Sequence, residues 1–273
     1  MIPLLALLLG LIIGSFLNVC IHRWPRDESV VRPRSHCLRC RNAISWYDNI
    51  PLASYLLLQG RCRHCGALIS IRYPLVELLN GFFYLYLASR FGWQPLTVKM
   101  AVFVSMMLVL IFTDIADYIL PDEITLGGLA GGLLLSPFLH VEAGFARLFW
   151  ILSTTDPAPW VMSLLECAFA AAFVGGLLYG MRAAYFRLRR VEGLGLGDVK
   201  MMAMVGAFWG LATTIGVLLI GSVVGAITGS LIVLIGRKKW TYEMPFGAYL
   251  GAGGIVAVVW GKDIGRWWVS VVT

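Results

Sequence analysis

Charged residues are scarce in this chain. Only 14% of its 273 residues are Asp, Glu, Lys or Arg, whereas a soluble domain has about a quarter. The mean hydropathy is +0.80, which excludes an ordinary water-soluble globular protein. Two hydrolase motifs are also missing. The absence of H-E-x-x-H excludes the common zinc peptidases, and the absence of G-x-S-x-G excludes a serine hydrolase of the nucleophile-elbow type.

Long apolar runs occupy most of the chain instead. A helix needs about 20 mainly apolar residues to cross roughly 30 Å of hydrocarbon, and such runs recur along the whole length. We therefore predict an all-α polytopic membrane protein with about eight transmembrane helices. The boundary between the sixth and seventh helices is the least distinct. The expected spans are residues 2–22, 74–91, 97–114, 124–140, 160–182, 199–212, 214–236 and 246–261.

Basic residues lie mainly on one side of these spans. The loops and margins after the first, third, fifth and seventh spans hold 17 of the 22 Lys and Arg residues, and the opposite side holds 5. The positive-inside rule places the richer side in the cytoplasm and the N-terminus outside. Nothing basic precedes the first apolar run, so we interpret it as a retained span in contact with lipid rather than a cleaved signal peptide. Topology explains the charge, and stacking aromatic residues are sparse in loop 23–72, so we expect no nucleic-acid partner.

Four of the six cysteines form two C-x-x-C pairs in this first cytoplasmic loop. Cys37 pairs with Cys40 and Cys62 with Cys65, with 21 residues between the pairs. In a reducing compartment this pattern favours tetrahedral zinc over disulfides. Four thiolates close the coordination shell, so the zinc is expected to be structural. It would hold together a polar segment that has little core of its own.

Acidic residues are placed where helices meet the cytoplasmic face. Asp198 follows the glycines of "EGLGLGD" and opens the sixth span, and Asp114 ends the apolar run of the third. A charge near hydrocarbon is costly, so both are candidates for function. Aspartate can also cap a helix N-terminus, a role that we assign to Asp122 and that stays open for Asp198. Asp117 and Glu123 are expected to be solvated.

Two carboxylates on one membrane face suggest aspartyl protease chemistry. When they are close together they cannot both ionise easily, and they share a proton. The ionised member then takes a proton from water, and the protonated member polarises the scissile carbonyl. Gly195 and Gly197 would let the backbone approach the substrate closely.

Six motifs now occur in a fixed order over nearly the whole chain: "GSFLNVCIHRWPR", the paired cysteines, "RYPLVELLNG", "DIADYILPDEIT", "GLGLGDVKM" and "MPFGAYLGAGG". Together they resemble the type IV prepilin peptidases, also called leader peptidase/N-methyltransferases. The resemblance implies a protease of the bacterial inner membrane that cuts a short basic leader from prepilins or type II secretion pseudopilins after a glycine. It also implies N-methylation of the new N-terminal residue with S-adenosylmethionine.

Site residues follow from the same resemblance. Asp114 and Asp198 match the two catalytic aspartates, and the paired cysteines match the zinc ligands. Loop 140–160 is longer than the family pattern, which affects none of these residues.

Methyl transfer is tied by the resemblance to the N-terminal third. Gly60, Arg61, Arg72 and Glu77 are its candidate substrate or cofactor residues. Arg72 could instead anchor the topology, and Glu77 could pair with a nearby arginine. We expect residues 1–93 to form the methyl-transfer region with the zinc loop, and residues 94–273 to form the peptidase.

Three alternative functions explain less of the sequence. A transporter that uses the two membrane aspartates as ion sites predicts carboxylates near mid-bilayer and an internal repeat, and the sequence has neither. A presenilin-like protease needs a tyrosine before its first aspartate and a later Pro-Ala-Leu motif, which are missing. A zinc-ribbon binding module would explain loop 23–72 and leave the aspartates without a role.

Overall fold

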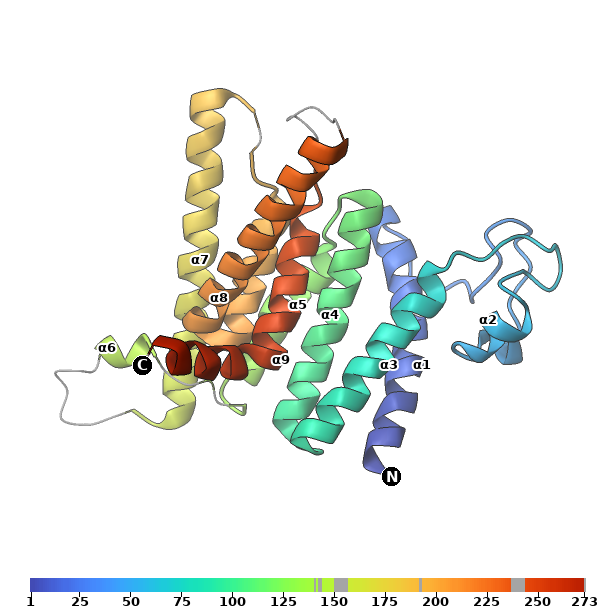
Figure 1. Ribbon diagram of the computed structural model, residues 1–273, viewed down its shortest axis with the longest axis horizontal. Helices are drawn as coiled ribbons and strands as arrows, with labels where there is room; N and C mark the ends of the chain where they lie inside the picture. The colour runs from blue at the N-terminus through green and yellow to red at the C-terminus, as the bar shows by residue number, and fades with distance from the viewer. Residues whose placement is uncertain (140, 142–143, 150–156, 192, 237–243, 273) are drawn as a thin grey trace. The chain divides into compact units, whose positions relative to one another are not determined.

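The computed structural model describes residues 1–139, 141, 144–149, 157–191, 193–236 and 244–272. The predicted fold class is confirmed at the level of an all-α chain with a cysteine cluster. Much of the predicted outer loop 140–160 lies outside the described residues. The helices, shown in Figure 1, are α1 (Ile2–Arg23), η1 (Trp24–Arg26), η2 (Trp46–Asn49), α2 (Ala53–Leu57), α3 (Arg72–Phe91), α4 (Pro95–Asp117), α5 (Asp122–Leu135), α6 (Ala146–Phe149), α7 (Pro159–Arg189), α8 (Leu196–Gly236) and α9 (Phe246–Val272).

The chain forms two compact units, residues 1–113 and residues 114–273, and the boundary falls inside α4. In the first unit, α1 and α3 pack along small residues. A Cβ atom on Gly14 would lie 2.7 Å from the Glu77 Cα, and one on Gly10 would lie 2.9 Å from the Gly81 Cα. Neither glycine could be replaced without separating the helices. Because lipid offers no hydrophobic drive for association, such close packing is what holds membrane helices together.

Buried polar side chains join the helices of this first unit. Asn80 donates from Nδ2 to the carbonyl of Gly10 on α1 at 2.7 Å. Its Oδ1 accepts a hydrogen bond of 2.8 Å from Ser105 on α4, and the Ser105 hydroxyl also lies 3.1 Å from that of Tyr84. This chain of hydrogen bonds gives the buried side chains of Asn80, Tyr84 and Ser105 their partners and links α1, α3 and α4.

In the second unit, α8 is central, and α5, α7 and α9 all pack against it. Within α8, Gly210 has the non-helical dihedral angles φ 74° and ψ −178°, and the helix changes direction there (Figure 1). The left-handed φ favours glycine, since other residues pay a steric cost in that region. This break coincides with the indistinct boundary that we predicted between the sixth and seventh spans.

A buried carboxylate satisfies the backbone groups that the break exposes. Glu166 on α7 accepts the Leu211 N–H at 3.1 Å through Oε1, and the N–H groups of Phe145 and Ala146 at 2.9 and 2.8 Å through Oε2. Its side chain is only 2% exposed. The first N–H groups of a helix have no partner within the helix, so Glu166 supplies acceptors for two helix starts at once.

Four helices among the described residues are long and apolar enough to cross a membrane: α1 extended by η1, α4, α7 and α8. The chain is therefore a multi-helix membrane protein. Each of the eight predicted spans overlaps a helical segment, if α8 is divided at Gly210, but α5 ends at Leu135, before the predicted end of its span at 140. Eight crossings remain a prediction.

Candidate active site and metal centre

Two aspartates from distant parts of the sequence meet in the second unit. Asp114 lies in the last turn of α4 and Asp198 in the first turn of α8, and they are 6% and 8% exposed. A Cβ atom built on Gly247 would lie 3.1 Å from Asp114 Oδ2 and 3.1 Å from Asp198 Oδ1. The two oxygens are therefore separated by no more than twice that distance. The two carboxylates therefore border the same point beside Gly247.

Three helix ends build this arrangement. The N–H of Ala248, in the first turn of α9, donates a hydrogen bond of 2.8 Å to Asp114 Oδ2 and fixes the orientation of that carboxylate. Asp198 is the third residue of α8, so it lies inside the helix, and the N-capping interpretation that we left open does not describe it. Unpaired N–H groups and the helix dipole make such a first turn favourable for a carboxylate.

An open pocket of about 290 Å³ contains both aspartates. It is formed by the end of α4, the α4–α5 connection and the start of α8. Its lining residues are Asp114, Tyr118, Ile119, Leu120, Asp122, Gly195, Leu196, Gly197, Asp198 and Lys200. Both glycines that the sequence singled out, Gly195 and Gly197, therefore lie at the pocket, as do the two aspartates.

The glycines are tightly enclosed. A Cβ atom on Gly195 would lie 3.0 Å from Asp198 Oδ2, and one on Gly197 would lie 3.0 Å from the Leu120 Cβ. A side chain at either position would press on the carboxylate or on the pocket wall. Sequence reasoning missed the parts played by Gly247 and Ala248. They lie in the motif "MPFGAYLGAGG" and follow Pro245 at the start of an apolar run, which marks a helix N-terminus without revealing what it faces.

The capping role that we predicted for Asp122 is wrong. Pro121 is the N-cap of α5 and no side chain caps this helix, so Asp122 is already the first helical residue. Its carboxylate instead pairs with Lys200 of α8, with Nζ 2.7 and 2.8 Å from the two oxygens. An ammonium partner within reach outcompetes the backbone N–H groups because both groups of the pair are charged.

The four paired cysteines come together in the first unit. All four Sγ atoms lie within 4.8 Å of one another, and those of Cys37 and Cys65 are 3.8 Å apart. A zinc ion with four thiolates at about 2.3 Å requires S···S separations of about 3.8 Å. The cluster therefore fits tetrahedral zinc, as the spacing predicted.

The two cysteine pairs are built alike. The Cys37 N–H donates to the Asn42 carbonyl at 2.9 Å, and the Cys62 N–H donates to the Ala67 carbonyl at 2.8 Å. The residue after each second cysteine, Arg41 or Gly66, has a left-handed φ of 58° or 67°. We call these two turns, residues 35–44 and 60–69, the first and second knuckles. Each directs two sulfurs to the same point.

Thiol chemistry agrees with a bound cation. A hydrogen bond from the Cys40 backbone is the main cause that lowers the pKa of Cys37 to about 6, and one from the Cys65 backbone likewise lowers the pKa of Cys62. The pKa of Cys40 rises to about 11. The Asn42 backbone opposes that rise, and burial and the neighbouring cysteines outweigh it. Four crowded thiols cannot all ionise without a positive charge between them.

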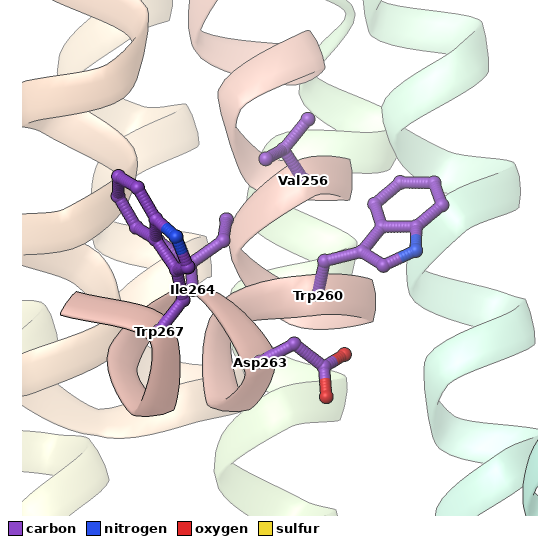
Figure 2. Close-up of a pocket in the computed structure, with 5 residues that line it drawn as sticks. All are labelled: Val256, Trp260, Asp263, Ile264 and Trp267. Atoms are coloured by element: carbon purple, nitrogen blue, oxygen red, sulfur yellow. The ribbon is translucent and has the colours of Figure 1, made fainter. Parts of the chain in front are cut away.

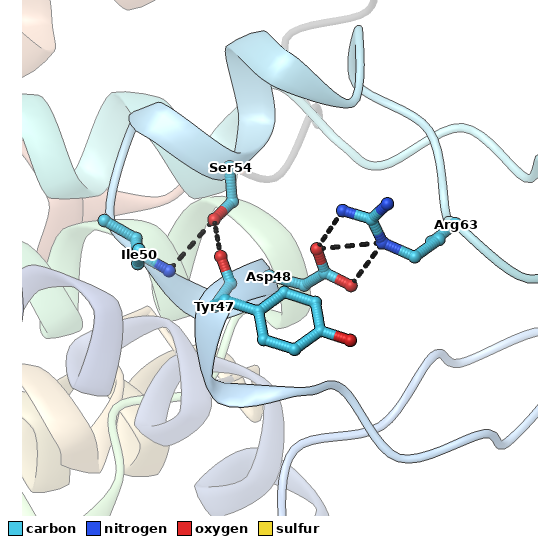
Figure 3. A network of polar contacts seen from close by, with 5 residues as sticks. All are labelled: Tyr47, Asp48, Ile50, Ser54 and Arg63. Atoms are coloured by element: carbon cyan, nitrogen blue, oxygen red, sulfur yellow. Dashed lines mark hydrogen bonds and ion pairs between the residues drawn. The ribbon is translucent and has the colours of Figure 1, made fainter.

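A polar network attaches the second knuckle to the segment between the knuckles (Figure 3). Arg63 binds Asp48 of η2 through Nε and Nη2, at distances of 2.6 to 3.1 Å, and this contact lowers the pKa of the Asp48 carboxyl. Ser54 of α2 donates to the Tyr47 carbonyl at 2.9 Å and accepts the Ile50 N–H at 3.0 Å. The segment between the knuckles is thereby folded against the metal centre.

The methyl-transfer candidates occupy two places. Gly60 has a left-handed φ of 65° and, with Arg61, belongs to the second knuckle. Arg72 and Glu77 lie at the start of α3, where the Arg72 guanidinium stands 5.4 Å from the centre of the Tyr73 ring. Glu77 accepts the N–H of Leu52 at 2.9 Å and also forms a side-chain hydrogen bond with Ser15, so neither of these observed partners is an arginine.

A second hollow, which includes neither Asp114 nor Asp198, lies along α9; Figure 2 shows its lining residues. It measures about 410 Å³ and is lined by Val256, Trp260, Asp263, Ile264 and Trp267. Val256 follows Gly247 by nine residues, or about 14 Å of helix. All five residues come from one helix, and the lining is almost entirely apolar, as expected for a helix surface that faces lipid.

Comparisons with known proteins agree with this geometry. The model of the bacterial peptidase A24 N-terminal domain matches residues 8–91, and that of the type IV leader peptidase family matches residues 101–230. A prepilin leader peptidase/N-methyltransferase from Myxococcus xanthus (strain DK1622) is 41% identical over 227 residues, which cover 83% of this chain and 62% of that relative. No solved structure matches the chain.

Proteins with the same name from other bacteria match over almost their full length. The one from Aeromonas salmonicida (strain A449) is 36% identical, with 98% of this chain and 94% of the relative covered. The one from Pseudomonas aeruginosa is 32% identical, with 96% and 92% covered. Since both halves of the chain match the family models and these relatives align from end to end, the chain belongs to the type IV leader peptidase family.

Proposed function

We propose that this protein is a membrane aspartyl peptidase that cleaves the basic leader from type IV prepilins or type II secretion pseudopilins, and that it N-methylates the new N-terminal residue. One observation carries the proposal: Asp114 and Asp198 face the same point beside Gly247 in an open pocket. The relatives named prepilin leader peptidase/N-methyltransferase support the substrate class and the second activity.

The two carboxylates divide the work of hydrolysis. One is ionised and takes a proton from a water molecule held between them, while the other is protonated and donates a hydrogen bond to the scissile carbonyl. The attacking water adds to the carbonyl carbon, and the carboxylate that took its proton passes that proton to the amide nitrogen, which leaves as an amine when the C–N bond breaks. The Ala248 N–H keeps the Asp114 carboxylate turned toward the water throughout.

The membrane topology brings the substrate to this pocket. With eight spans and the N-terminus outside, the zinc loop and both aspartates lie at the cytoplasmic face of the bacterial inner membrane. A prepilin has a basic leader in the cytoplasm and an apolar helix in the bilayer, so its cleavage site lies at the same depth. Three carboxylates and one ammonium line the pocket, and this excess of negative charge suits a basic leader.

The methyl-transfer activity belongs, on this proposal, to residues 1–93. S-adenosylmethionine supplies the methyl group when it is bound. Zinc held by Cys37, Cys40, Cys62 and Cys65 organises the loop. Gly60 and Arg61 in the second knuckle, and Arg72 and Glu77 on α3, are the candidates for substrate or cofactor contacts. Residues 94–273 form the peptidase.

Mass spectrometry of the N-terminus of a co-expressed pilin tests both activities together. We expect Asp114→Asn and Asp198→Asn each to leave the leader uncut, because an amide cannot act as the base or share the proton. Asp117→Asn is the matched control: Asp117 is one helical turn beyond Asp114 and does not line the pocket. It should retain cleavage.

All variants must reach the membrane at wild-type levels. Normal leader cleavage in Asp114→Asn or Asp198→Asn would exclude the aspartate pair as the catalytic group. Correct cleavage without a mass increase of one methyl group at the new N-terminus would limit this protein to the peptidase activity.

A further inference from the structure

The α4–α5 connection carries one side chain directly against the aspartate pair. Asp117 ends α4, and Tyr118 then adopts a left-handed φ of 55°, which turns the chain back. As a result Leu120 is half-buried in the pocket, whereas Tyr118 and Ile119 are 52% and 43% exposed. Leu120 was not a candidate on sequence grounds.

Leu120 contacts the two glycines that adjoin the carboxylates. A Cβ atom on Gly197 would lie 3.0 Å from the Leu120 Cβ and 3.2 Å from its Cδ1. A Cβ atom on Gly247 would lie 2.9 Å from the Leu120 Cδ1, and that same point is 3.1 Å from an oxygen of each aspartate. The Leu120 Cδ1 therefore stands beside the point that an oxygen of each aspartate adjoins.

The position of Leu120 is fixed from both sides. The Tyr118 N–H donates to the Asp114 carbonyl at 3.0 Å and closes the end of α4. Two residues after Leu120, Asp122 is bound by Lys200 of α8 at 2.7 and 2.8 Å. Each end of the connection is therefore bound to a helix that carries one of the two aspartates. These contacts fix the position of the Leu120 side chain relative to Asp114 and Asp198.

We propose that Leu120 determines specificity by limiting the size of the substrate residue on the leader side of the scissile bond. Leu120 lies beyond the ends of α4 and α8, on the loop side of the aspartates, which is where the leader enters in the proposed topology. A side chain on that residue competes with the Leu120 methyl groups for the space next to Gly197 and Gly247. The site therefore favours a residue with little or no side chain. This inference rests on the proposed peptidase function.

The test measures relative kcat/KM of the purified full-length protein on three pilin peptides that differ only in the residue before the cleavage site: Gly, Ala or Val. Leu120→Ala removes three carbons from the pocket wall and should raise the Ala-to-Gly and Val-to-Gly ratios by about tenfold or more. Leu120→Phe should lower both ratios. Ile119→Ala is the matched control, since Ile119 is the neighbouring residue but contributes none of the three atoms nearest a Cβ on Gly197 or Gly247, and its ratios should stay at the wild-type values.

A ratio cancels any loss of folded protein, so partial instability does not obscure the result. Unchanged ratios in Leu120→Ala, or the same change in Ile119→Ala, would overturn the specificity role. Loss of all three activities in both Leu120 variants, with normal membrane levels, would make Leu120 a packing residue and overturn it too. Failure of the underlying function looks different: the wild-type protein would then cut none of the peptides, or Asp114→Asn would still cut them.

Discussion

Replacing Gly247 by alanine should abolish most of the activity without unfolding the protein. The added methyl group would lie 2.9 Å from the Leu120 Cδ1 and 3.1 Å from an oxygen of each aspartate. It would lie against both carboxylates, and relief of these contacts requires displacements of a few tenths of an ångström. A displacement of about 1 Å in a catalytic group costs roughly 10²-fold in rate, or about 2.7 kcal/mol of transition-state stabilisation, so this smaller displacement should cost about tenfold.

Stability should not follow activity. Alanine favours the helical conformation over glycine by up to about 1 kcal/mol. This higher helix propensity at the start of α9 offsets part of the destabilisation that the close contacts cause. Gly261→Ala is the matched control: it makes the same change on the same helix, where a Cβ atom meets nothing within 4 Å. We expect Gly261→Ala to keep wild-type activity.

The assay combines kcat/KM on a pilin peptide with the melting temperature in detergent. If Gly247→Ala were within threefold of wild type, the aspartate pair could not be as close to Gly247 as the structure places it. If activity and melting temperature fell together, the methyl group would be disturbing the packing of α9 rather than the aspartate pair.

Three other predictions follow from the packing and the metal centre. Glu166→Gln should lower the melting temperature. The glutamine amide nitrogen cannot accept a hydrogen bond, so at least one backbone N–H group is left unpaired, at a cost of about 1–3 kcal/mol. An unchanged melting temperature would contradict the capping role of Glu166. Gly66→Ala should weaken the retention of zinc in competition with a chelator about fivefold, because a left-handed φ costs an alanine about 1 kcal/mol. Arg41→Gly should retain zinc at least as well as wild type. Replacing Cys37 and Cys40 together by serine should remove stoichiometric zinc and reduce methylation more completely than cleavage; normal methylation without zinc would separate this loop from methyl transfer.

Local patterns predicted the parts of the site that depend on residue type and spacing. Two C-x-x-C pairs specify a metal centre because a turn of that length directs both sulfurs to one side, and the cysteines do cluster. An aspartate that adjoins an apolar run is costly enough to indicate function, and Asp114 and Asp198 do meet at one pocket. The helical segments also follow from hydropathy, since each predicted span overlaps one.

What the sequence could not predict depends on contacts between distant residues. Glu166 reads as an ordinary charge near the start of a span, and only the fold shows that it serves the break at Gly210, 44 positions away. Asp122 has the residue type and position of an N-cap, but a lysine from another helix binds it instead. Leu120 is one leucine among many until the chain reversal at Tyr118 places it against two glycines.

The hydrogen bond from Ala248 to Asp114 joins residues 134 positions apart. The match to the type IV leader peptidase family model ends at residue 230, before α9 begins. A chain that is still being synthesised therefore carries both aspartates before it carries the amide that orients one of them and the glycine that leaves room between them. An unfinished chain has the reactive groups without their final alignment. The order of the sequence thus places the completion of the aligned aspartate pair after the packing of α9.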